Sequence, residues 1–207
     1  MAAPPAALLP DFVQLHYAIE ALRSEERPIV LQFMSAGGGD GTSTVAAGFA
    51  AVAASEHPGA VLLVGCTGAT PGAPSGTPSL AELSARGHPP GEAVWRDPAC
   101  EGVRRASLGV SAHPLMEIAS GALRRLLIGL GERYATVVMD CAPAASPDSA
   151  ALSRHCDGTV LVVRAGTTRV AAVDQARVAV ERAGGHVVGV VLNRRRRALP
   201  PWLDRML

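Results

Sequence analysis

Apolar residues along this chain follow two patterns, a helical period of about 3.6 residues and short continuous runs. The helical period predicts helices over residues 11–24, 43–55, 79–85, 116–133 and 169–183. The continuous runs, rich in Val and Leu, predict buried strands over residues 29–34, 60–64, 103–108, 136–140, 158–164 and 186–192. Because strands and helices alternate, we expect right-handed βαβ units. The fold class that follows is α/β, with a mostly parallel central sheet flanked by helices.

No internal repeat or linker interrupts the 207 residues, so we expect a single domain over residues 1–207. It would consist of an N-terminal helical region over residues 1–27, a core over 28–197 and a tail over 198–207. The stretch 65–78 is full of Gly, Pro, Ser and Thr. We expect it to be a loop of this domain and not a boundary.

The composition narrows the class of protein. Aromatic residues make up only 3% of the chain, so its core must consist of Ala, Val and Leu, which suits parallel strands covered by helices. The net charge of +1 gives no overall field that attracts nucleic acid or a membrane. The four cysteines have no CxxC or zinc spacing, and the first residues lack the basic region of a signal peptide. No apolar run approaches the roughly 20 residues of a spanning helix. We expect a cytoplasmic protein.

A glycine-rich segment, SAGGGDGTST at residues 35–44, connects the first predicted strand to the next helix. In a phosphate-binding loop, glycines let consecutive backbone N–H groups turn towards phosphate oxygens, and a Ser or Thr hydroxyl meets Mg²⁺. We expect this segment to surround a nucleotide phosphate, with Ser43 on the metal. The residues concerned are Gly38, Gly39, Asp40, Gly41, Thr42, Ser43 and Thr44. The plainer alternative is a strand-to-helix turn with no ligand.

The lysine of such a loop is missing. Thr42 occupies its position, and all 19 basic residues of the chain are arginines, so no other lysine can replace it. A charge-assisted hydrogen bond to phosphate is worth about 1.5–3 kcal/mol. The loss should therefore weaken nucleotide binding by roughly one to two decades, and phosphoryl transfer by more, because that reaction depends on positioning and charge.

Further candidate residues follow the other predicted strands. In a parallel sheet the loops at residues 37–42, 65–70, 141–148 and 193–197 should share the carboxyl edge, where ligands bind. Asp140 ends its strand, either as a ligand of Mg²⁺ or as a cap of the following loop. Asn193 ends the last strand and precedes four arginines at 194–197, which are either a solvated surface run or a grip for an acidic partner, lipid head groups or a phosphate.

These motifs resemble the kinase domain of the bacterial tyrosine kinases of capsule and exopolysaccharide synthesis, which are related to partition and division-site ATPases. The match extends to the Asp140-Cys141-Ala142-Pro143 segment, with a later acid at Asp148, and to the blocks 157–169 and 189–193. In relatives the asparagine corresponding to Asn193 contacts adenine. The family's second acidic motif, Asp-x-Asp-x-Arg-x-Pro, is replaced by GCTGATP at residues 65–71, where only the proline remains.

Other functional parts of that family also lack a counterpart. Its tyrosine cluster is absent, since Tyr17 and Tyr134 are the only tyrosines, and its N-terminal assembly motif is at best Asp11, Gln14 and Tyr17. Together with Thr42, these losses predict a pseudo-kinase with no catalytic residue and a vestigial Asp140. ATP or ADP with Mg²⁺ would bind weakly or not at all, through residues 38–44, Asn193 and Asp140.

The resemblance implies a partner in polysaccharide export. The expected function is that of a non-catalytic, regulatory binding protein of an exopolysaccharide polymerisation complex. Its partner would be an inner-membrane polysaccharide co-polymerase or a related pathway protein, which would hold it at the membrane face, and a homo-oligomer stays open. The alternative is an active ATPase or protein-tyrosine kinase completed by a partner in trans, as arginine fingers do. A partition-type ATPase is disfavoured by the net charge and the missing lysine.

Overall fold

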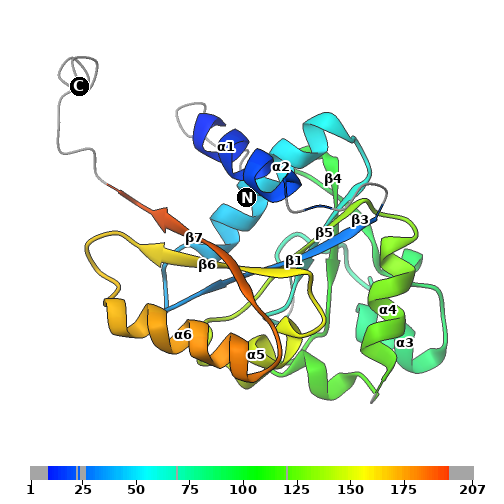
Figure 1. The fold of residues 1–207 in the computed structure, drawn as a ribbon. Helices are drawn as coiled ribbons and strands as arrows, with labels where there is room; N and C mark the ends of the chain where they lie inside the picture. The colour runs from blue at the N-terminus through cyan, green and yellow to red at the C-terminus, as the bar shows by residue number, and fades with distance from the viewer. Residues whose placement is uncertain (1–8, 22, 24–26, 69, 120, 196–207) are drawn as a thin grey trace.

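Strand β1, Ile29–Ser35, is buried along its whole length and lies near the middle of the sheet (Figure 1). The computed structural model describes residues 9–21, 23, 27–68, 70–119 and 121–195. Its strands are β1, β2 (Val61–Gly65), β3 (Trp95–Asp97), β4 (Cys100–Ser107), β5 (Thr136–Asp140), β6 (Gly158–Arg164) and β7 (Val187–Asn193). Its helices are α1 (Leu9–Glu20), α2 (Thr42–Glu56), α3 (Leu80–Arg86), α4 (Ala122–Gly131), α5 (Pro147–Ser153) and α6 (Val170–Arg182), with 3₁₀ turns η2 (Pro90–Ala93) and η3 (Pro114–Glu117).

The seven strands form one sheet in the order β3-β4-β2-β5-β1-β6-β7. All neighbouring pairs are parallel except β3 with β4. The chain leaves β1, passes over β5 and enters the sheet again at β2. The carboxyl end of β1 is therefore a place where successive connections diverge, which is where ligands bind in such sheets. The prediction of a single α/β domain with a mostly parallel sheet is confirmed.

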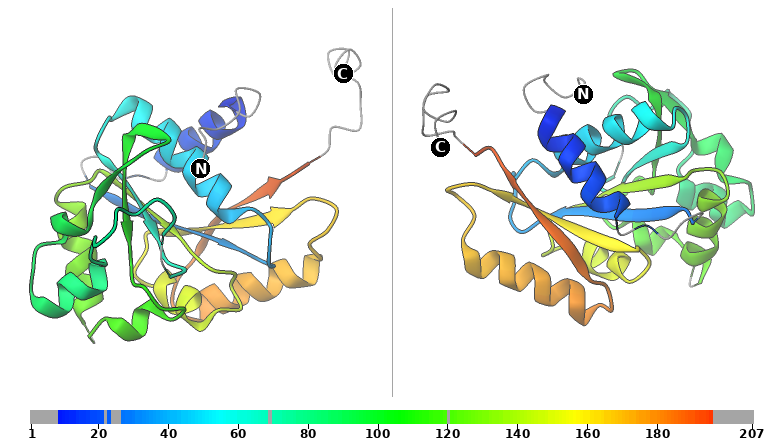
Figure 2. Two further views of the ribbon diagram at one scale, coloured as in Figure 1. Left: turned by 180° about the vertical axis from the view of Figure 1, so that it is seen from behind. Right: turned by 45° about the horizontal axis from the view of Figure 1, so that its top comes forward.

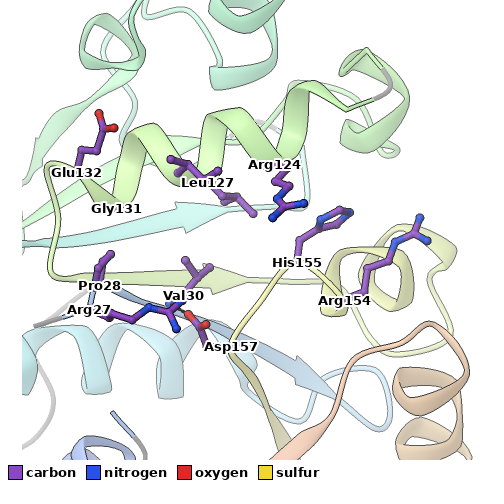
Figure 3. A pocket seen from close by; sticks show the side chains of 11 residues that line it. Arg27, Pro28, Val30, Arg124, Leu127, Gly131, Glu132, Arg154, His155 and Asp157 are labelled. Carbon is purple, nitrogen blue, oxygen red and sulfur yellow. Dashed lines mark hydrogen bonds between the residues drawn. The ribbon is translucent and has the colours of Figure 1, made fainter. Parts of the chain in front are cut away.

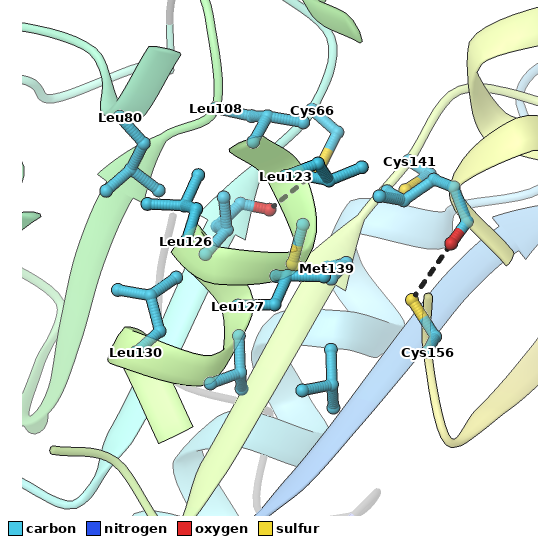
Figure 4. Packing of buried hydrophobic residues seen from close by; sticks show 14 of the residues in the cluster. Cys66, Leu80, Leu108, Leu123, Leu126, Leu127, Leu130, Met139, Cys141 and Cys156 are labelled. Atoms are coloured by element: carbon cyan, nitrogen blue, oxygen red, sulfur yellow. Dashed lines mark hydrogen bonds between the residues drawn. The ribbon is translucent and has the colours of Figure 1, made fainter. Parts of the chain in front are cut away.

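Helices cover both faces of the sheet (Figures 1 and 2). On one face α1 and α2 pack Phe12, Phe49 and small Ala-rich surfaces against the strands. On the other face α3, α4, α5 and α6 cover a larger cluster of leucines, methionines and cysteines (Figure 4). Burial raises the pKa of the Cys66 and Cys156 thiols well above the ordinary value. These cysteines therefore stay protonated, as expected for small buried residues.

Most predicted elements appear within a few residues of their expected limits, but one prediction is wrong. The periodic stretch 116–133 is not one helix: the 3₁₀ turn η3 ends at Glu117, and α4 begins only after Gly121, which has a φ of +77°. A left-handed residue cannot continue a right-handed helix. The helical period of the apolar residues continues from η3 into α4 although the helix itself does not. The three-residue strand β3 and the seven-residue helix α5 were not predicted.

Candidate functional site

The segment after β1, residues 36–41, forms a tight turn that depends on two glycines in the left-handed conformation. Gly39 and Gly41 have φ of +78° and +92°, a conformation that favours glycine. Gly41 caps helix α2, and its carbonyl oxygen accepts hydrogen bonds from the Thr44 and Val45 amides. Among the described residues, the backbone amides of residues 38–43 have no hydrogen-bond acceptor. They remain available to an anion at the helix N-terminus, as in a phosphate-binding loop.

Asp40, by contrast, is buried and turned into the protein. Its carboxylate accepts hydrogen bonds from the Gly37 amide at 3.0 Å and from the Thr168 hydroxyl at 2.9 Å. Its backbone carbonyl accepts a hydrogen bond from the Asn193 side-chain amide at 2.8 Å. The side chain therefore shapes the loop and fastens it to the segment after β6.

Asn193 lies directly over Gly41. A Cβ atom at Gly41 would come within 2.3 Å of the Asn193 Nδ2 atom, so glycine is required there for space as well as for φ. The sequence predicted both Asp40 and Asn193 as nucleotide contacts. The structure brings both to the loop and gives each a hydrogen bond within the protein.

The three residues that open α2 differ in exposure. Thr42, in the lysine position, is only 8% exposed, whereas Ser43 and Thr44 are exposed to solvent. Gly38 and Gly39 are also exposed at the tip of the turn. The loop thus presents backbone amides and two hydroxyl-bearing residues, and no cation.

Asp140 stands at the end of β5, next to the strand that feeds the loop, with Phe33 as its register partner. Burial raises the pKa of the Asp140 carboxyl, while a hydrogen bond with the Ser43 side chain and the charge of Arg105 act in the opposite direction. The predicted pair of metal-side residues, Ser43 and Asp140, is therefore brought together. Hydroxyl and carboxylate oxygens suit Mg²⁺, which takes its other ligands from water and phosphate.

The loop after β2 is closed onto the sheet. A Cβ atom at Gly65 would lie 2.2 Å from the Thr70 Oγ1 atom, so the Thr70 side chain fills the space that a longer residue at position 65 would use. The Thr70 amide donates to the Ser107 hydroxyl at 3.3 Å, and an Arg105 guanidinium nitrogen donates to the Pro71 carbonyl at 3.4 Å. No acidic residue occurs between positions 65 and 71.

Arg105 is a residue of this region that sequence reasoning missed. It lies on β4, is only 6% exposed, and pairs with Asp97 on β3 at 3.2 Å. Side chains alternate along a strand, so Val103, Arg105 and Ser107 share the face that α2 covers. The available signal was the pair of arginines, Arg104 and Arg105, inside the predicted strand over residues 103–108. Its antiparallel partner strand could not be foreseen.

The other predicted residues are Asp148 and the arginines at 194–197. The Asp148 carboxylate accepts a hydrogen bond from the Leu115 amide at 3.1 Å and lies 3.6 Å from His113, so it fastens η3 to α5. Arg194 and Arg195 are exposed after β7, and the arginines at 196–197 and the tail at 198–207 lie outside the described residues. Within the described ranges, no cluster of three His, Cys, Asp or Glu side chains could hold a metal.

Solved structures give the comparison that decides the fold. The kinase domain of VpsO has 25% identity and a TM-score of 0.76, over 92% of this chain and 95% of that one. The kinase domain of the Escherichia coli tyrosine kinase ETK has 22% identity and a TM-score of 0.71, over 91% and 76%. The chain has the fold of a P-loop tyrosine kinase domain. No family model and no curated protein matches its sequence.

The same fold extends to P-loop ATPases. The septum site-determining protein MinD from Pyrococcus horikoshii, solved with Mg-ADP, has 18% identity and a TM-score of 0.64, over 86% of this chain and 76% of that one. The likeness shows that the two chains share this fold. In the described part of the chain, no helix is both long and apolar enough to cross a membrane.

Proposed function

We propose that this chain is a non-catalytic, tyrosine-kinase-like P-loop protein that regulates an exopolysaccharide polymerisation complex by binding to it. The observation that carries the proposal is the contrast between the loops after β1 and β2. The backbone cradle of residues 38–43 is in place, whereas the loop at 65–71 has no acid and is closed by Thr70. Phosphoryl transfer needs charge at both places.

A nucleotide is then a ligand and not a substrate. The amides of residues 38–43 would hold the phosphates, and Ser43 with Asp140 would hold Mg²⁺. Without a lysine, binding is weaker by about 1.5–3 kcal/mol than in a complete loop. Bound ATP or ADP would change the conformation or stability of the loop. Asp40 and Asn193 connect this loop to the segments that follow β6 and end β7.

The partner follows from the family resemblance. A cytoplasmic segment of an inner-membrane polysaccharide co-polymerase, or another protein of that pathway, is the proposed binding partner. Arg194 and Arg195 are exposed and offer a basic contact for an acidic segment. Serine substitutions across residues 194–197 should abolish capture of that partner without changing the melting temperature.

One observation favours a second function, that of an ATPase or protein-tyrosine kinase completed by a partner in trans. The Ser43 side chain acts to lower the pKa of the Asp140 carboxyl, so the two residues lie together beside an open amide cradle. A partner that inserted an arginine could complete the site in trans, as GTPase-activating proteins do.

The deciding experiment is calorimetric titration with MgATP and MgADP, followed by a turnover assay with and without the co-polymerase segment. We expect weak binding and no hydrolysis above that of Ser43→Ala in either condition. Turnover by the isolated protein that Ser43→Ala abolishes would contradict the proposal. Turnover only with the partner would establish completion in trans.

A further inference from the structure

A cavity lies at the opposite edge of the sheet from the glycine-rich loop at residues 37–44. Its volume is about 740 Å³, within the range of small-molecule sites. Its lining comes from the start of β1, from α4 along most of its length and from the turn before β6. Nothing in the proposed nucleotide chemistry uses this place.

One wall of the cavity is apolar. Val30 and Leu127 are buried and form part of its floor, and Ile128 stands at the rim with 54% of its surface exposed. An isoleucine on an exposed helix face gains nothing from water. It is placed to cover the apolar part of a bound molecule.

Positive charge gathers at one end of the cavity. Arg124 from α4 and Arg154 and His155 from the turn after α5 all line it, and Figure 3 shows the Arg124 and His155 side chains pointing towards each other. Neither arginine forms an ion pair with a described residue. Burial and then the charges of Arg154 and Arg124 lower the pKa of His155. Both arginines are therefore close enough to His155 for their charges to disfavour its protonation.

The acidic residues of the cavity do not neutralise that end. Asp157 uses one carboxylate oxygen to accept a hydrogen bond from the Val30 amide at 2.7 Å, and Figure 3 places it beside Arg27. Glu132 lies at the far end of α4, away from His155 (Figure 3). The cavity therefore has a cationic end next to an apolar wall.

We propose that this cavity binds an amphipathic anion, a phosphate or carboxylate head on a short hydrocarbon body, with the head held by Arg124, Arg154 and His155. An anion between these groups would offset their repulsion, and a charge-assisted hydrogen bond from each arginine would fix it. Val30, Leu127 and Ile128 would cover the hydrocarbon. The head is recognised by charge, so a soluble phosphate ester and a lipid head group share the required chemistry.

The test uses the full chain and hexyl phosphate as the probe. Calorimetry should give at least tenfold tighter binding of hexyl phosphate than of inorganic phosphate, and no competition by MgADP. The double variant Arg124→Gln/Arg154→Gln should weaken hexyl phosphate binding by about 10- to 100-fold. The matched control Arg125→Gln removes a neighbouring exposed charge that does not line the cavity, and should leave affinity unchanged.

A second measurement is the pKa of the His155 imidazole with and without the probe. Bound hexyl phosphate should raise the pKa of His155, measured by NMR titration of its ring protons, because the anion stabilises the imidazolium. Loss of the imidazolium charge should weaken binding as pH rises through that pKa, whereas the second ionisation of hexyl phosphate, at about pH 6, acts in the opposite direction. The NMR shift of the His155 pKa is therefore the readout. The other ionisable groups lining the cavity are Arg27, Arg124, Glu132, Arg154 and Asp157.

Vesicles of phosphatidylcholine with and without phosphatidic acid distinguish the two sources. Sedimentation with the acidic vesicles that the double variant loses and Arg125→Gln keeps would assign a lipid head group. Binding of hexyl phosphate without sedimentation would assign a soluble ligand. The inference is overturned if hexyl phosphate does not bind, if the double variant binds it as tightly as the parent chain, or if an acidic peptide alone occupies the cavity.

Discussion

The loops after β1 and β2 stand at the same edge of the sheet, separated only by β5, yet they differ in the groups that they present to a ligand. The loop after β1 keeps the shape of a phosphate cradle, since that shape is made by glycine conformations and backbone amides. The loop after β2 would act through carboxylate side chains, and Gly65 and Thr67 have none. The Thr70 side chain occupies the space beside Gly65.

The difference shows which kind of function survives substitution. A backbone site depends on a few φ values and on helix α2, which the fold needs for its core in any case. A side-chain site disappears with one residue, and the neighbouring chain packs into the gap because an unfilled space costs dispersion energy. The first loop should therefore respond to an added charge, whereas the second should not.

The largest effect is expected from Thr42→Lys. A lysine in this position would reach the outer phosphates of a nucleotide held by the intact cradle. Affinity for MgATP should rise by about 10- to 100-fold, or about 1.5–3 kcal/mol, without autophosphorylation. Calorimetry measures the affinity for MgATP, and radiolabelling from ATP measures autophosphorylation.

The control is Ser55→Lys, which places the same charge at the other end of α2 and should change neither the affinity nor the labelling. Robust autophosphorylation of Thr42→Lys would mean that the second acidic motif lies elsewhere.

The next effect concerns the backbone of the first loop. Gly41→Ala should lower the free energy of unfolding by about 2 kcal/mol, because an L-residue pays roughly 1–2 kcal/mol in the left-handed region and its Cβ would also displace Asn193. For a chain of this size that corresponds to a melting temperature lower by about 4–8 °C. Gly38→Ala is the matched control, since a Cβ there meets nothing within 4 Å. Equal melting of the two variants would refute the stated role of Gly41.

A double-mutant cycle of Gly65 and Thr70 tests the packing of the loop after β2. Gly65→Asp should destabilise the chain by overpacking against Thr70, whereas Thr70→Ala should be nearly neutral because the buried Thr70 hydroxyl has no partner among the described residues. In the double variant about 1 kcal/mol should be recovered. Urea denaturation of the four proteins measures this coupling energy. Strict additivity would show that Thr70 does not occupy the space beside Gly65.

The smallest effect is a pH dependence at Asp140. Burial raises its pKa, so the folded state favours the protonated form, and the parent chain loses stability as pH rises through the folded-state pKa. Asp140→Asn has no such loss. Its melting temperature relative to the parent should be about equal at pH values below the ordinary carboxyl pKa, and should increase towards neutral pH. A relative stability that fell with rising pH would reverse the assigned sign.

Local signals in the sequence were enough for most of the fold. The strand ending at Asp140 and the strand over residues 158–164 match the structure, because continuous apolar runs of that length have few alternatives in a parallel sheet. The broken helix at 116–133 was missed because Gly121 interrupts the chain without interrupting its apolar period. The antiparallel strand β3 depends on pairing with β4, which three residues cannot signal.

The sequence by itself determined the fold class, the glycine cradle and the missing charges, since each depends on residue type at a fixed spacing. Only the tertiary structure decided where the remaining side chains turn. Asp40 and Asn193 fasten the loop, Thr70 closes the space beside Gly65, and Arg105 lies buried under the crevice beside Asp97. The physical reason is that these contacts join residues that lie far apart in the chain. Strand order and packing fix the distances between them, and a local sequence pattern contains no information on either.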